Sequence, residues 1–110
     1  MRVFVSIVLA AAMITACGGD DGALSPSDAV ATTEVDVVDN EFVPSVIEIE
    51  VGDTVTWTWG GQDQHDVAGD GFESEVQTSG TFSHTFESPG EYDYVCNIHA
   101  DMEGLVVVEG

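Results

Sequence analysis

The sequence predicts an all-β fold, a β-sandwich, from about residue 34 to the end of the chain. Short runs rich in β-branched and aromatic residues alternate there with turn residues such as Gly, Pro and Asp. Hydrophobic side chains recur at every second position within the runs, and no segment sustains the 3.6-residue period of a helix. Because half-buried strands need a second apolar layer, we expect two antiparallel sheets packed face to face.

The individual strands follow from the parity of their hydrophobic residues. The clearest is the run TVTWTW, in which one valine and two tryptophans share one face while three threonines take the other. In the run before it, Ile47, Ile49 and Val51 are expected to share an apolar face, with Glu48 and Glu50 opposite. The complete set of expected strands covers residues 35–38, 45–51, 54–59, 81–86, 91–96 and 105–108.

The N-terminal region has the features of an export signal. Arg2 precedes an apolar run over residues 3–14, which is too short to span a bilayer that needs about 20 residues. Small residues then lead to Cys17 in a pattern similar to a lipobox; a plain signal peptide that happens to precede a Cys is the alternative. We therefore expect a lipoprotein signal peptide over residues 1–16, a lipidated Cys17 with a flexible linker over 17–33, and a folded domain over 34–110. The protein would be exported and lipid-anchored at the outer face of the cell membrane or on its periplasmic side.

The charge balance excludes whole classes of partner. The chain has 21 Asp and Glu residues against one Lys or Arg, which is Arg2, and a formal net charge of −20. Nucleic acids are excluded as partners, because binding them needs Lys and Arg, and the same lack argues against docking on an anionic membrane leaflet through a basic patch. The acidity suits either high salt or a partner with a basic face, and the sequence does not decide between them. Close acidic pairs such as Glu73 and Glu75 are expected by chance, so we interpret them as solvated surface.

A group of soft metal donors follows the expected strand over residues 91–96. Cys96, His99 and Met102 recur at every third residue, so that a loop could wrap them around one ion. Thiolate, imidazole and thioether together favour copper, and a site of two His, one Cys and a weak axial Met is the blue-copper arrangement. A second His must come from elsewhere. His65 lies at the end of a loop, whereas His84 lies within a strand on an apolar face, where packing is the favoured interpretation.

These motifs occur together with longer matching stretches, and the chain resembles the small blue (type 1) copper proteins of the cupredoxin family, in the group of plastocyanin, amicyanin and halocyanin. The short Cys-x2-His-x2-Met loop is similar to that of amicyanin, and the acidic tethered chain is more similar to halocyanin. The resemblance covers about residues 35–109. The matching stretches are FVPSVIEIEVGDTVTWTW, HDV, TFSHTFESPGEYDYVC and CNIHADMEGLVVVE.

The resemblance implies a Greek-key sandwich of eight-strand type that holds one copper ion. It implies equatorial ligands His65, Cys96 and His99, with Met102 axial, and a role in single-electron transfer rather than catalysis. In such proteins electrons pass at the edge of the C-terminal His, which here is His99, to redox protein partners. We expect a monomer whose partners present a basic docking face.

Two residues depart from the family pattern. Asp66 stands where the family usually has Asn, so the side chain beside the first His accepts hydrogen bonds but cannot donate one. Ile98 stands where Pro often precedes the second His. Three other functions remain open: a copper-handling module without electron transfer, a metal-free interaction module, and a zinc protein, which would leave Met102 without a role.

Overall fold

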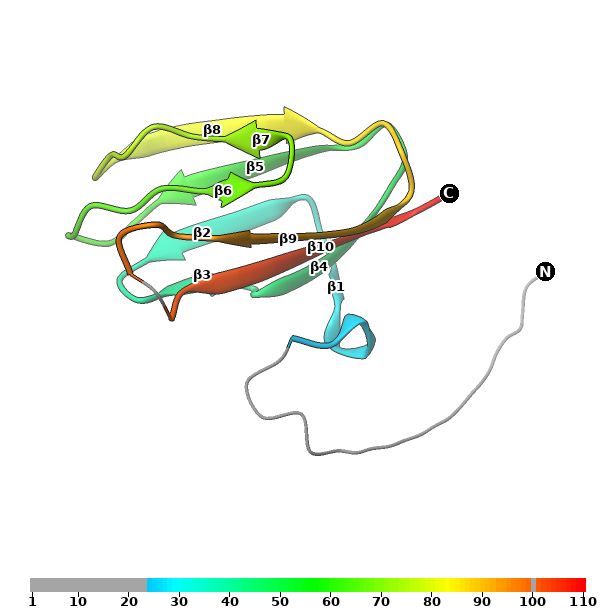
Figure 1. Ribbon diagram of the computed structural model, residues 1–110, viewed down its shortest axis with the longest axis horizontal. Coiled ribbons are helices and arrows are strands. Elements are labelled where there is room, and N and C mark those ends of the chain that lie inside the picture. Colours follow the sequence, from blue (N-terminus) through cyan, green and yellow to red (C-terminus); the bar gives the residue numbers. More distant parts are fainter. Residues whose placement is uncertain (1–23, 100) are drawn as a thin grey trace.

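The computed structural model describes residues 24–99 and 101–110, and these residues form a sandwich of two β-sheets (Figure 1). The arrangement confirms the predicted all-β fold. No helix within the described residues is long and apolar enough to cross a membrane. The elements are a short 3₁₀ helix η2 (Pro26–Asp28) and the strands β1 (Val30–Ala31), β2 (Glu34–Val38), β3 (Glu41–Val43), β4 (Val46–Glu50), β5 (Thr54–Trp59), β6 (Ala68–Gly69), β7 (Phe72–Glu73), β8 (Gly80–Thr85), β9 (Gly90–Val95) and β10 (Glu103–Glu109).

Both sheets are mixed rather than antiparallel, so this part of the prediction was wrong. One sheet has the strand order β1-β4-β10-β9-β6-β7 and the other β3-β2-β5-β8. Strand β4 pairs in parallel with both β1 and β10, and β2 pairs in parallel with β5. The physical reason is that the chain crosses between the layers, for example from β4 to β5. Strands that are distant in sequence therefore become neighbours that run in the same direction.

The core between the sheets contains the side chains that the strand parity placed inward. Trp57 of β5 lies at its centre, with ring centroids 5.8 Å from Phe72, 5.6 Å from Phe82 and 5.4 Å from Tyr94. Fully burying one such large apolar side chain stabilises the fold by about 1.5–3 kcal/mol. This packing fixes the end of β5, from which the loop to His65 departs.

One core assignment and several strand ends differ from the prediction. Val51 is 41% exposed, so placing it on the apolar face was wrong. Strand β4 ends at Glu50 because a turn begins at Val51, whose N–H donates to the carbonyl of Glu109, and Gly52 then takes a positive φ of 94°. Two predicted strands are shifted: Phe86 and Cys96 lie just beyond β8 and β9, although both are buried.

The segment that the sequence predicts as linker contains regular structure in its described part. Within residues 24–33, η2 is capped by the side chain of Ser25, and β1 adds to the edge of β4 through the pairs Val30↔Ile47 and Ala31↔Glu48. The expected signal peptide over residues 1–16 and the lipidation site Cys17 lie outside the described residues.

Candidate metal centre

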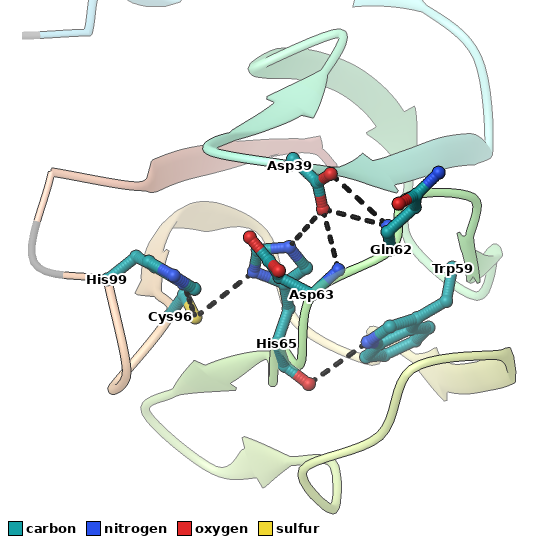
Figure 2. A network of polar contacts seen from close by, with 7 residues as sticks. All are labelled: Asp39, Trp59, Gln62, Asp63, His65, Cys96 and His99. Carbon is teal, nitrogen blue, oxygen red and sulfur yellow. Dashed lines mark hydrogen bonds and ion pairs between the residues drawn. The ribbon is translucent and has the colours of Figure 1, made fainter.

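Three predicted ligands converge at one end of the sandwich. His65, Cys96 and His99 each offer one donor atom, and these atoms all lie within 4.8 Å of one another. The Sγ of Cys96 lies 3.9 Å from Nδ1 of His65 and 3.8 Å from Nδ1 of His99 (Figure 2). His65 and Cys96 are buried, while His99 is half-buried. The site is therefore shielded on one side and open along the His99 side.

The loop that carries most of the predicted ligands is closed by backbone hydrogen bonds. Strands β9 and β10 pair in antiparallel fashion, which brings the two ends of this loop together. The N–H of Cys96 donates to the carbonyl of Met102 at 3.0 Å, and the N–H of Met102 donates to the carbonyl of His99 at 3.0 Å. Met102 is 1% exposed, so its thioether is buried within the same loop. These backbone hydrogen bonds fold the three-residue spacing into a tight turn.

His65 reaches the site from the other part of the chain, and its backbone is held on two sides. Its N–H and carbonyl form a bridge with Gln77, at 3.1 Å and 3.0 Å. The indole Nε1 of Trp59 donates to the same His65 carbonyl at 3.0 Å in a buried hydrogen bond. Because Trp59 is buried at the end of β5, its hydrogen bond ties the backbone of this histidine to the core.

The imidazole of His65 also has a side-chain partner that the sequence did not indicate. Its Nε2 lies 3.1 Å from Oδ1 of Asp39, in the turn between β2 and β3 (Figure 2). The backbone N–H of Asp63 and the His65 imidazole hold the pKa of Asp39 below its ordinary value. The only signal in the sequence was the Asp39–Asn40 pair, which is typical of a turn; Asn40 takes a φ of 72° there.

Asp66, the first departure from the family pattern, ties the two ligand loops together. It is 2% exposed, and its Oδ1 accepts the backbone N–H of Asn97 at 2.7 Å. Its Oδ2 accepts the side-chain Nδ2 of Asn97 at 3.0 Å. Both carboxylate oxygens are thus used as acceptors, which explains how Asp can brace the loop at this position without a donor of its own.

The other predicted features lie outside the cluster. His84 stacks on Phe72 with ring centroids 5.0 Å apart, and its ring lies 4.7 Å from Phe86, which confirms its interpretation as a packed aromatic side chain. Ile98, the second departure, is 45% exposed next to His99. Glu73 and Glu75 are both exposed, as expected for solvated surface.

The chemistry of the donor set fits copper. The donors are a buried thiol, two imidazole nitrogens and a buried thioether, which are soft or intermediate ligands. Copper binds such ligands well, whereas the hard cations Mg²⁺ and Ca²⁺ prefer oxygen. A family model described as a cupredoxin-like domain matches residues 4–108 of the chain. The chain belongs to the cupredoxin family of small blue copper proteins.

Curated relatives support the same family. This cupredoxin is 37% identical over 86 residues to amicyanin-alpha of Methylorubrum extorquens, covering 71% of this chain and 72% of the relative. It is 41% identical over 78 residues to halocyanin of Natronomonas pharaonis, covering 62% of this chain. The alignment spans only 48% of that halocyanin.

Solved structures share the fold of this cupredoxin. A purple cupredoxin from Nitrosopumilus maritimus matches with a TM-score of 0.64 and 29% identity, over 69% of this chain and 98% of that one. A Cu(I) form of an amicyanin variant matches with a TM-score of 0.61 and 30% identity, over 69% and 80% of the two chains. A copper-containing nitrite reductase from Thermus scotoductus matches with a TM-score of 0.62 and 30% identity, over 70% of this chain but 22% of the enzyme.

Proposed function

We propose that this cupredoxin binds one copper ion and carries single electrons between redox proteins. The observation that carries the proposal is the convergence of His65 Nδ1, Cys96 Sγ and His99 Nδ1 at one shielded point. These three side chains would hold the copper ion, together with the thioether of Met102. When bound, copper supplies reversible one-electron chemistry between Cu(I) and Cu(II).

The residues around the site have two tasks in this function. The buried Cys96 thiol is kept away from bulk water and oxidants, and the hydrogen bonds on the backbone of His65 hold the ligand geometry fixed. A fixed geometry keeps structural change during electron transfer small. The half-buried His99, next to the exposed Ile98, is the edge through which a partner exchanges electrons.

The cellular setting is a separate part of the proposal. The sequence around Cys17 supports export and a lipid anchor, so the domain would be tethered to the outer face of the membrane or on its periplasmic side. The net charge of −20 supports redox partners that present a basic face. Mass spectrometry of the membrane fraction tests the anchor: the wild-type chain should begin at an acylated Cys17, and the variant Cys17→Ser should not.

Electron exchange tests the proposed function against copper handling without electron transfer. The copper-loaded chain should be reduced and reoxidised repeatedly, with the metal retained throughout. Rapid loss of copper to a chelator of moderate affinity, on the timescale of electron exchange, would instead favour a copper-handling module. The matched control is Cys96→Ser, which keeps the size of the side chain but removes the sulfur donor.

A further inference from the structure

The carboxylate of Asp39 holds the loop that leads to His65. Its Oδ1 accepts the backbone N–H groups of Gln62 at 3.0 Å and of Asp63 at 2.9 Å, and its Oδ2 lies 3.2 Å from the same Gln62 nitrogen. The same Oδ1 lies 3.1 Å from Nε2 of His65 (Figure 2). One side chain from the β2–β3 turn therefore contacts two loop amides and the imidazole.

The loop sequence leaves room for this contact. A Cβ atom added to Gly61 would lie 2.8 Å from the backbone nitrogen of Asp39 and 2.9 Å from its Cγ, closer than real Cβ contacts. A residue with a side chain at position 61 would therefore displace Asp39 or the loop. The contact of Asp39 with the loop therefore requires glycine at position 61, although the two residues are distant in the sequence.

The two ring nitrogens of His65 face different groups. Nε2 faces a carboxylate, which in its ionised form accepts hydrogen bonds but cannot donate one. Nδ1 faces the Sγ of Cys96. The ring is 0% exposed, so water cannot replace either partner. The proton therefore belongs on Nε2, where it is donated to Asp39, and the lone pair of Nδ1 is left pointing at the donor cluster.

We propose that Asp39 is a positioning residue of the metal centre: it fixes the Nε2–H tautomer of His65 and places a negative charge behind this ligand. The proposal rests on the function proposed above only in taking His65 as a copper ligand. A carboxylate behind a histidine ligand orients the ring and makes its other nitrogen more basic. It also favours the more highly charged Cu(II) state, so Asp39 lowers the reduction potential.

The first test uses the copper-free chain and does not depend on copper binding. Imidazole ¹⁵N chemical shifts, measured in mildly alkaline buffer, distinguish the two neutral tautomers of His65. The wild-type chain should show Nε2–H alone, and Asp39→Ala, which removes the acceptor, should show a mixture. Nδ1–H in the wild-type chain would overturn the proposal, and so would an unchanged single tautomer in a folded Asp39→Ala variant.

The second test measures the reduction potential of the copper-loaded chain. Asp39→Asn keeps an acceptor oxygen for the loop amides but removes the charge. We expect Cu(II) binding to weaken about tenfold relative to Cu(I), a rise of about 59 mV. The control is Asp63→Asn, which removes an equal charge from an exposed side chain of the same loop and should shift the potential less than half as far.

The outcomes separate this inference from the proposed function. The inference would be overturned if Asp39→Asn and the wild-type chain had equal reduction potentials, or if Asp39→Asn and Asp63→Asn shifted the potential equally. Either result would show that Asp39 only holds the loop through its backbone hydrogen bonds. Failure of the wild-type chain to bind copper would overturn the proposed function, while the ¹⁵N measurement would still decide the role of Asp39.

Discussion

Replacing the buried Asp66 by Asn should raise the reduction potential of the metal centre. The substitution removes one negative charge with little change in shape. The new side-chain amide would still accept the backbone N–H of Asn97 through its Oδ1. The Asn97 side-chain amide can rotate by half a turn to accept from the new Nδ2, so both contacts between the ligand loops survive. The effect on the potential is then mainly electrostatic.

The size of the effect follows from the hydrogen-bond geometry. Oδ1 of Asp66 lies 2.7 Å from the nitrogen of Asn97. The covalent path from that nitrogen to the Sγ of Cys96 spans at most about 5 Å, which puts the charge within about 8 Å of the sulfur. At an effective dielectric constant of about 20 this is worth about 2 kcal/mol, or roughly 90 mV for one electron. Solvent beside the exposed Asn97 reduces this, so we expect a rise of tens of millivolts.

Protein-film voltammetry at fixed ionic strength measures this shift. Asp36→Asn is the matched control, because it removes the same charge from an exposed position on β2 and should leave the potential nearly unchanged. A potential for Asp66→Asn that is equal to or lower than that of the wild-type chain would refute the electrostatic reasoning. An equal rise in both variants would show that overall charge, not this carboxylate, sets the potential.

Three further predictions concern stability and docking. Burial raises the pKa of Tyr94 above its ordinary value of 10.0, so the free energy of unfolding should hold below about pH 10 and fall above it, as the unfolded chain releases the proton. Urea unfolding between about pH 8 and 11 should show this fall in the wild-type chain but much less of it in Tyr94→Phe, because the lost hydroxyl is buried without a geometrically formed hydrogen bond to any described residue. Gly104→Ala should destabilise the fold by about 1–3 kcal/mol, because the new methyl group would overlap the Tyr94 ring, while Gly60→Ala, with its nearest neighbour at 4.0 Å, should cost less in the same assay. Electron exchange with a basic partner, followed by stopped-flow absorbance, should slow as salt is added; a rate independent of salt would contradict docking through the acidic surface.

The strands and the loop that carries Cys96, His99 and Met102 could be predicted because their sequence signals are local. The alternation through Val55, Trp57 and Trp59 directly reports a half-buried strand, and the structure places β5 at the predicted residues. Likewise, Cys96, His99 and Met102 are close in sequence, so a single turn is enough to gather them. Local spacing carries this information without knowledge of the sheet order.

The features that could not be predicted depend on contacts between distant segments. Asp39 lies 26 residues from His65. Its turn meets the loop that leads from β5 to His65 only because β2 pairs with β5 in parallel. The same limit applies to the sheets: β4 and β10 lie side by side although more than fifty residues separate them. The clash that requires glycine at position 61 is also invisible without the fold.

A copper titration of the chain without its first 17 residues tests the central claim most directly, because Cys96 is then the only thiol. We expect one equivalent of Cu(II) to give an intense visible absorption band and an electron paramagnetic resonance spectrum with narrow copper hyperfine splitting, both absent in Cys96→Ser. Colourless binding, or identical spectra for the two chains, would show that the Cys96 thiolate does not hold the metal and would contradict the electron-carrier function.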